Sequence, residues 1–152
     1  MNFTGVKAPE PPKTVHQYKP ITDYMTRDVY TLSPDMSIAD AMDMFLEKKI
    51  SGAPVVDERG KISGILSEID CMRILVDEAY FNLPHGKITV ANYMSEGVSV
   101  LHDTMDVLDC AQKFLATNFR RFPVVDVNGK LTGTISRRDI MRATRDMKTS
   151  TW

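Results

Sequence analysis

The stretch GTISRRD, residues 133–139, repeats the pattern of an earlier stretch, GILSEID, residues 64–70. Glycine, serine and aspartate keep the same spacing in both. The match extends outward, because residues 21–73 align with residues 90–142 without a gap, at a constant shift of 69 positions. An internal repeat of this kind indicates one structural unit that occurs twice.

Matching residues run along the whole repeat. The tetrapeptide PVVD occurs at 54–57 and again at 123–126. The other matched groups are Tyr24-Met25 with Tyr93-Met94, Phe45-Leu46 with Phe114-Leu115, Gly60-Lys61 with Gly129-Lys130, and Gly64, Ser67, Asp70 and Arg73 with Gly133, Ser136, Asp139 and Arg142.

Each copy predicts an amphipathic first helix, because apolar residues recur at helical spacing. Ser37 and Asp106 precede these helices at the N-cap position, where a side-chain oxygen can accept from a free helix N–H. The apolar positions are Ile38, Ala41, Met42, Phe45 and Leu46 in the first copy, and Val107, Cys110, Ala111, Phe114 and Leu115 in the second.

The remaining elements follow from the same comparison. APVVDERGKISGIL (53–66) and FPVVDVNGKLTGTI (122–135) each place two short β-branched runs around a glycine-containing turn, which predicts a hairpin. A second helix follows over about 68–80 and 137–147, and VYTL (29–32) and VSVL (98–101) predict short entry strands. The sequence therefore predicts an α+β fold of two β-α-β-β-α repeats.

The predicted organisation is one domain of two interdependent halves, because a unit of about 50–60 residues buries too little surface to be stable alone. The two copies should therefore pack together about a pseudo-two-fold axis. Prolines disfavour a helix near the N-terminus, and Pro84 and Gly86 mark a connector. We expect a flexible tail at 1–18, repeats at 19–80 and 90–148, a connector at 81–89 and a C-terminal tail at 149–152.

Composition excludes several classes of function. The net charge is −1, which gives no overall attraction to nucleic acid or anionic membranes. Cys71 and Cys110 lack metal-ligand spacing, and His16, His85 and His102 are scattered, so we expect no metal site. No paired catalytic carboxylates, nucleophile with its base, or P-loop is visible, which argues against an enzyme. Without a secretory signal or a membrane-length apolar run, we expect a cytoplasmic protein.

The repeat, PVVD before a turn, and Gly-x-x-Ser-x-x-Asp entering the last helix together resemble a tandem CBS-domain pair, or Bateman module, over about residues 18–148. The resemblance implies a non-catalytic regulatory sensor that binds AMP, ADP, ATP or sometimes S-adenosylmethionine between its halves. It further implies that one repeat supplies an aspartate for the ribose and a serine for the phosphate. The other repeat then holds the base with its entry strand and the segment before PVV.

Two composite sites follow from this resemblance. Site A would comprise Val29, Ile50, Ser51, Gly52, Ala53, Pro54, Ser136, Arg138 and Asp139. Site B would comprise Ser67, Asp70, Val98, Arg120, Arg121, Phe122 and Pro123.

The two sites differ in charge at equivalent positions. Site A has Arg138, which can pair with phosphate, where site B has Ile69. Site B also has Glu68, a carboxylate that repels phosphate, although Arg120 and Arg121 can compensate. We therefore expect site A to bind the nucleotide more tightly.

Ser-x-x-Asp has a second interpretation, because Ser followed three residues later by an acidic residue is also the capping-box pattern. The two roles are compatible, since a helix N-terminus presents free N–H groups to a phosphate. A pure interaction scaffold, in which the motif only caps helices, stays open as an alternative.

We expect a homodimer that signals to an unidentified partner. Nucleic-acid binding is a lesser alternative, suggested by the basic last helix with Arg137, Arg138, Arg142, Arg145 and Lys148. Basic residues near a helix C-terminus also have an ordinary explanation, because they complement the helix dipole.

Overall fold

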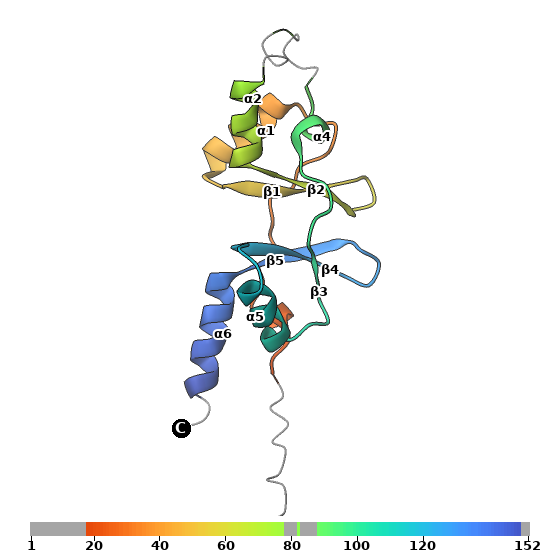
Figure 1. The fold of residues 1–152 in the computed structure, drawn as a ribbon. Coiled ribbons are helices and arrows are strands. Elements are labelled where there is room, and N and C mark those ends of the chain that lie inside the picture. Colours follow the sequence, from red (N-terminus) through yellow and green to blue (C-terminus); the bar gives the residue numbers. More distant parts are fainter. Residues whose placement is uncertain (1–17, 78–81, 83–87, 150–152) are drawn as a thin grey trace, which may run out of the picture.

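Two antiparallel hairpins lie at the centre of the molecule, and helices cover the outer side of each hairpin (Figure 1). The computed structural model describes residues 18–77, 82 and 88–149. The two hairpins also meet at their turns, where the Leu131 N–H donates to the Gly60 carbonyl at 3.0 Å. This arrangement confirms the predicted α+β fold with two similar halves.

The first half contains helix α1 (Ile38–Lys48), strands β1 (Gly52–Val56) and β2 (Ile62–Ser67), and helix α2 (Glu68–Val76). The β1–β2 hairpin is antiparallel, and its turn includes Gly60 at φ +79°, a conformation that glycine adopts without strain. The helices and hairpin share one core: Leu32, Ile38, Ala41, Phe45, Ala53, Val55, Leu66, Ile74, Ile88 and Val90.

The second half repeats this order with strand β3 (Leu101–His102), helix α5 (Val107–Leu115), strands β4 (Arg121–Val125) and β5 (Leu131–Ser136), and helix α6 (Arg137–Thr149). β3 is parallel to β4, and β4 is antiparallel to β5. Its core comprises Ile21, Tyr24, Leu101, Val107, Cys110, Phe114, Phe122, Val124, Ile135, Ile140 and Ala143.

The halves exchange their entry segments. The short 3-10 helix η1 (Ile21–Asp23) starts the first repeat but packs in the core of the second half. Helix α4 (Val90–Tyr93) starts the second repeat but packs in the core of the first half. The chain therefore crosses between the halves twice (Figure 1), and neither half has a complete core without the other.

The glycine of Gly-x-x-Ser-x-x-Asp admits these crossing segments. Thr26 pairs with Thr134 on one side of the molecule, and Ser95 pairs with Ile65 on the other. A Cβ on Gly133 would lie 2.5 Å from the Thr26 carbonyl oxygen, and a Cβ on Gly64 would lie 2.8 Å from that of Ser95. Only glycine permits so close a backbone approach.

The predicted entry strands are shorter than expected. The prediction of a strand over 29–32 was wrong, since only Leu32 forms a bridge, with Val55. In the second half the strand is Leu101–His102 rather than 98–101. The physical reason is the exchange, because the intervening residues span the distance between the halves instead of pairing along a sheet.

One predicted cap was also wrong. Ser37 occupies the N-cap of α1, but its side chain makes no capping bond. The first N–H of the helix, at Ile38, instead donates to the backbone carbonyl of Ile88 at 3.0 Å. Asp106 caps α5 as predicted, accepting from the Asp109 N–H at 2.9 Å.

Two predicted helix positions lie outside the core. Leu46 and Leu115 end the apolar stripes of α1 and α5, yet their exposures are 78% and 88%. Helix α2 ends at Val76, short of the predicted 80. Most of the expected tails and of the connector lies outside the described residues. Within the described ranges, no helix combines the length and apolar character that crossing a membrane requires.

Candidate ligand site between the two halves

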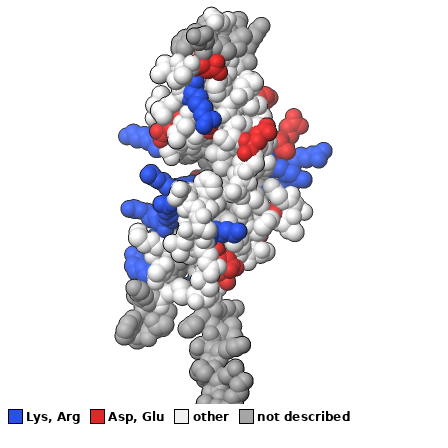
Figure 2. Space-filling model, viewed as in Figure 1, with Lys and Arg blue, Asp and Glu red and all other residues white. Residues whose placement is uncertain are grey.

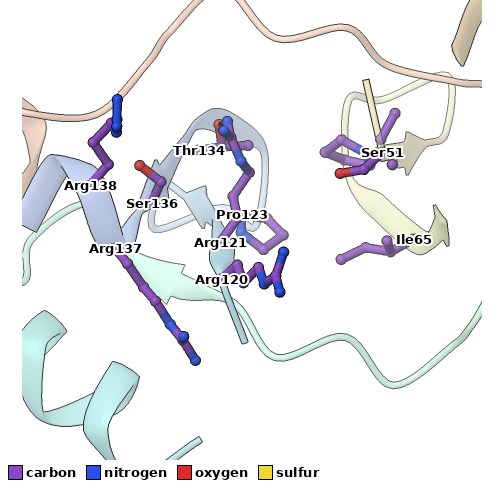
Figure 3. A pocket seen from close by; sticks show the side chains of 12 residues that line it. Ser51, Ile65, Arg120, Arg121, Pro123, Thr134, Ser136, Arg137 and Arg138 are labelled. Carbon is purple, nitrogen blue, oxygen red and sulfur yellow. Dashed lines mark hydrogen bonds between the residues drawn. The ribbon is translucent and has the colours of Figure 1, made fainter. Parts of the chain in front are cut away.

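A cavity of about 740 Å³ lies between the two hairpins (Figure 3). Its volume falls within the range of small-molecule pockets. We call it the main cavity, and it is lined by Ser51, Gly52, Ala53, Pro54 and Ile65 from the first half and by Arg120, Arg121, Pro123, Thr134, Ser136, Arg137 and Arg138 from the second.

The two walls of the main cavity differ in chemistry. The first half contributes small and apolar side chains, whereas the second contributes four arginines and two hydroxyls. Among the described residues that line it, none is Asp or Glu. Lys and Arg side chains gather beside the junction of the halves, on the side where α6 lies (Figure 2). The main cavity thus suits a ligand with an apolar part and an anionic part.

A second cavity of about 340 Å³ adjoins the first. The two share Ser51, Gly52, Pro54, Arg121 and Thr134, and the adjoining cavity adds Thr26, Asp28, Val29, Tyr30, Lys49 and Ile50. At their boundary the Arg121 guanidinium donates to Thr134 Oγ1 at 3.1 Å. A ligand can therefore extend past Arg121 from one cavity into the other.

Ser136 and Asp139 form a capping box at the start of α6. The Ser136 N–H donates to Asp139 Oδ2 at 2.8 Å, and the Asp139 N–H donates to Ser136 Oγ at 3.2 Å. Arg142 donates to Asp139 Oδ1 at 2.7 Å. The Ser136 hydroxyl donates to no acceptor among the described residues. It therefore remains available as a donor at the main cavity.

Ser67 and Asp70 form the equivalent box at α2, but their bonds differ. The Ser67 hydroxyl donates to Asp70 Oδ2 at 3.0 Å, so its hydrogen is already used. The Ser95 hydroxyl, from the crossing segment, donates to Asp70 Oδ1 at 3.3 Å. Asp70 is 3% exposed, and neither Ser67 nor Asp70 lines the main or the adjoining cavity.

Most of the residues predicted for site A lie around these two cavities. Ser51, Gly52, Ala53, Pro54, Ser136 and Arg138 line the main cavity, and Val29 and Ile50 line the adjoining one. Asp139 lines neither, since it is buried beneath Ser136 in the capping box.

The residues predicted for site B are divided. Arg120, Arg121 and Pro123 line the main cavity, together with the residues of site A. Ser67, Asp70 and Val98 line neither cavity. Phe122 is 2% exposed and packs in the core, with its ring 4.8 Å from that of Phe114 and 5.5 Å from that of Phe119, measured between ring centroids.

Sequence reasoning missed Ile65, Thr134 and Arg137 in the main cavity. A signal for Thr134 was present, because it lies two residues before Ser136 on β5 and side chains alternate along a strand. Ile65 has the same relation to Ser67. Asp28, Tyr30 and Lys49 are chain neighbours of the predicted Val29 and Ile50, whereas Thr26 reaches the adjoining cavity through its pairing with Thr134, which the sequence did not indicate.

The two cysteines lie close to the capping aspartates. Burial, with a smaller effect from the Asp139 charge, raises the pKa of the Cys110 thiol to about 12. Burial, with smaller effects from Asp70 and Glu68, raises the pKa of Cys71. Both thiols are therefore protonated at neutral pH, which makes them poor nucleophiles.

The chain is similar to proteins of known sequence. It is 30% identical to the CBS domain-containing protein CBSX2, chloroplastic, of Arabidopsis thaliana over 157 residues, which cover 86% of this chain and 66% of that protein. It is 33% identical to an inosine-5'-monophosphate dehydrogenase of Aquifex aeolicus over 74% of this chain, but only 22% of the dehydrogenase. The chain thus spans about two thirds of the first relative and a small part of the second.

Solved structures share the fold. The crystal structure of CBSX2 in complex with AMP matches with a TM-score of 0.73 and 32% identity, covering 86% of this chain and 98% of that one. The CBS domain pair of protein MJ0100, in complex with 5'-methylthioadenosine and S-adenosyl-L-methionine, matches with a TM-score of 0.69 and 25% identity, covering 86% and 99%. The family model of the CBS domain matches twice, at residues 21–77 and 90–146, so the chain belongs to the CBS-domain family as a tandem pair.

Proposed function

We propose that this chain is a regulatory module that binds an adenine nucleotide in the main cavity. The observation that carries the proposal is the contrast between its walls, one small and apolar and the other basic with a free hydroxyl at Ser136. A nucleotide has the same division, with an apolar base at one end and charged phosphate at the other. The relatives crystallised with AMP, and with 5'-methylthioadenosine and S-adenosyl-L-methionine, support an adenosine-containing ligand.

The site A residues are assigned roles by their chemistry. Val29, Ile50 and Ala53 offer apolar contact to the base. Asp139 lines neither cavity, so its role here is to position Ser136, whose N–H donates to the carboxylate at 2.8 Å. The Ser136 hydroxyl donates to phosphate at the positive end of the α6 dipole.

Calorimetry on a matched pair of variants tests this site. Ser136→Ala and Ser67→Ala each remove a capping hydroxyl, but only Ser136 lines the main cavity. We expect affinity for the best adenine nucleotide to fall about tenfold in Ser136→Ala, equivalent to about 1.4 kcal/mol. We expect it to be unchanged in Ser67→Ala. Equal losses in both variants would assign the effect to helix capping rather than to ligand contact.

Signalling requires that the ligand favour one arrangement of the two halves over another. The exchanged entry segments support such coupling, because η1 and α4 each join one repeat to the core of the other half. Capture of partners from cell extract, with and without nucleotide, tests it. A partner set that is identical in both conditions, with no nucleotide bound in calorimetry, favours the interaction scaffold.

A homodimer is the proposed assembly. Helix α2 exposes four apolar side chains, with exposures between 60% and 83%: Ile69, Met72, Leu75 and Val76. A face of this kind is typical of a protein interface rather than of a free surface. Light scattering tests the proposal with Leu75→Glu, which should convert a dimer to a monomer. Monomeric wild-type protein at high concentration contradicts it.

The proposed function also includes an absence of catalysis and a cytoplasmic location, and both can be tested. The absence of catalysis is tested by incubating ATP with the protein and analysing the products. Conversion of ATP to a product would indicate that the protein is an enzyme. A cytoplasmic location is tested by imaging the tagged chain, and the chloroplastic relative makes the plastid the compartment to compare.

A further inference from the structure

The basic wall of the main cavity contains more positive charge than a single phosphate needs. Arg120, Arg121, Arg137 and Arg138 line the cavity, and no lining carboxylate offsets them. We infer that this cavity selects a nucleotide with a chain of two or more phosphates over a monophosphate. This inference rests on the proposed function, because it names the class of nucleotide that the same cavity takes.

The four arginines differ in how far the protein already uses them. Arg121 donates to Thr134 Oγ1, and the Nε of Arg137 donates to the Phe119 carbonyl at 2.8 Å. The guanidinium groups of Arg120 and Arg138 form no hydrogen bond or ion pair with any other described residue. Two guanidinium groups at the cavity are thus uncommitted, and guanidinium is well suited to bidentate phosphate binding.

The two uncommitted arginines lie on different parts of the wall. In Figure 3 Arg120 extends toward the wall of Ser51 and Ile65, whereas Arg138 lies on the far side of Ser136. Arg138 follows Ser136 by two positions and lies beside it in Figure 3, so a phosphate held at Ser136 is next to Arg138. A longer phosphate chain reaches further across the wall and provides negative charge for Arg120 as well.

The first repeat serves as an internal control for the role of these arginines. At the equivalent positions Arg120, Arg121, Arg137 and Arg138 are replaced by Ser51, Gly52, Glu68 and Ile69, none of them basic. The first repeat nevertheless forms the same hairpin and the same capped helix. The hairpin and the capped helix therefore form without these four positive charges, so the charges of the uncommitted Arg120 and Arg138 are available to a ligand.

Calorimetry on the full chain tests the inference with adenosine, AMP, ADP and ATP, in buffer with EDTA so that the phosphates keep their full charge. A phosphate monoester carries about two negative charges, and each added phosphate increases the total. We expect ATP to bind at least about tenfold more tightly than AMP, with ADP between them.

Arg120→Gln is the decisive variant. It should reduce the affinity for ATP about tenfold and that for AMP less than about twofold, because only the longer chain reaches this side chain. Arg59→Gln is the matched control, since Arg59 lines neither cavity and its loss removes the same net charge. The control should leave both affinities unchanged.

The possible outcomes separate the inference from the proposed function. Binding of AMP as tightly as ATP overturns the inference and leaves adenine-nucleotide binding intact. Equal losses of AMP and ATP affinity in Arg120→Gln also overturn it, because Arg120 then contacts a part of the ligand that AMP and ATP share. Absence of binding by any adenosine compound contradicts the proposed function itself. GTP or inorganic tripolyphosphate binding as tightly as ATP upholds the phosphate-chain preference and contradicts adenine recognition.

Discussion

The two Ser-x-x-Asp boxes have nearly the same sequence and cap the same helix in each repeat, but only the serine of the second box lines the main cavity. At α6 the Ser136 hydroxyl has no protein acceptor among the described residues and faces the main cavity. At α2 the Ser67 hydroxyl donates to Asp70. A motif can therefore be complete as a helix cap in both copies and available for binding in one.

The crossing segments explain part of this difference. Ser95 donates to Asp70 on one side of the molecule, whereas the equivalent residue on the other side, Thr26, lines the adjoining cavity. The exchanged segment thus supplies a hydroxyl to the carboxylate at α2, whereas Arg142, from the same helix, donates to the carboxylate at α6. The comparison teaches that two copies of one motif can have different surroundings, because different residues reach each copy from the other repeat.

The largest expected effect is on folding, at the close backbone contact of each half. Gly133→Ala places a Cβ 2.5 Å from the Thr26 carbonyl oxygen, and Gly64→Ala places one 2.8 Å from that of Ser95. We expect a loss of about 3 kcal/mol of unfolding free energy for Gly133→Ala and a smaller loss for Gly64→Ala. Urea denaturation measures both. A larger loss in Gly64→Ala would reverse the order of the two contacts.

The next effect is on nucleotide affinity, and it compares the two aspartates directly. Asp139→Ala and Asp70→Ala both lose a capping carboxylate, so each should lose about 1 kcal/mol or more of stability. Only Asp139→Ala should lose nucleotide affinity, by about tenfold, because Asp139 holds the Ser136 N–H and Ser136 lines the main cavity, whereas Ser67, held by Asp70, does not. Calorimetry measures it at a temperature where both variants are folded. Loss of the tighter binding event in Asp70→Ala alone would reverse the ranking of the sites.

A smaller effect separates the two arginines that contact these aspartates. Arg142 donates to Asp139 at 2.7 Å and to the Tyr24 carbonyl at 3.3 Å, whereas Arg73 lies 3.8 Å from Asp70 and its side chain is 69% exposed. We expect Arg142→Gln to reduce stability by about 1 kcal/mol and Arg73→Gln by about 0.5 kcal/mol or less. Thermal unfolding of the two variants provides the measurement. Equal shifts would mean that the bond to the exchanged entry segment contributes nothing.

The smallest effect is on thiol reactivity. The raised pKa of Cys110, about 12, keeps this thiol protonated at pH 8, and its side chain is fully buried, whereas Cys71 is partly exposed. A thiol reagent should therefore modify Cys71 first in the folded protein. Cys110 should react only after unfolding, which returns its pKa toward about 8.5. Mass spectrometry of the partly labelled protein identifies the site, and labelling of Cys110 first would contradict its burial.

Stability should also respond to pH through Cys110. Because its pKa is raised in the folded state, the thiol contributes stability below the pKa of the unfolded chain. That contribution is lost as pH rises toward about 12.

Much of the fold follows from local patterns that the chain repeats. The spacing of Phe45 and Phe114 within apolar stripes gave the first helices, and PVVD with a glycine turn gave both hairpins. The failures have one cause. Leu32 forms a single bridge because the residues before it cross between the halves, and the first N–H of α1, at Ile38, donates to Ile88 in the segment that leads to the other repeat. Sequence patterns report local geometry and carry no information on exchange between repeats.

The candidate site divides in the same way. Ser136 and Arg138 were identifiable because they belong to a motif, and both line the main cavity. Arg120 and Arg121 were assigned to the other site by pseudo-symmetry, yet they line this same cavity. Symmetry of the sequence suggested two separate sites, whereas the side chains of the second repeat gather their charge around one.

The sequence by itself determined the duplicated unit, its capped helices and hairpins, and which residues could donate to a phosphate, because these depend on short-range spacing. Only the tertiary structure decided which serine is free. The Ser67 hydroxyl and the Asp70 carboxylate are occupied by bonds that include one from Ser95, 25 positions away from Asp70 along the chain. The physical reason is that packing brings distant segments to each box, Ser95 to Asp70 and Thr26 to the adjoining cavity, and short-range spacing does not specify such contacts.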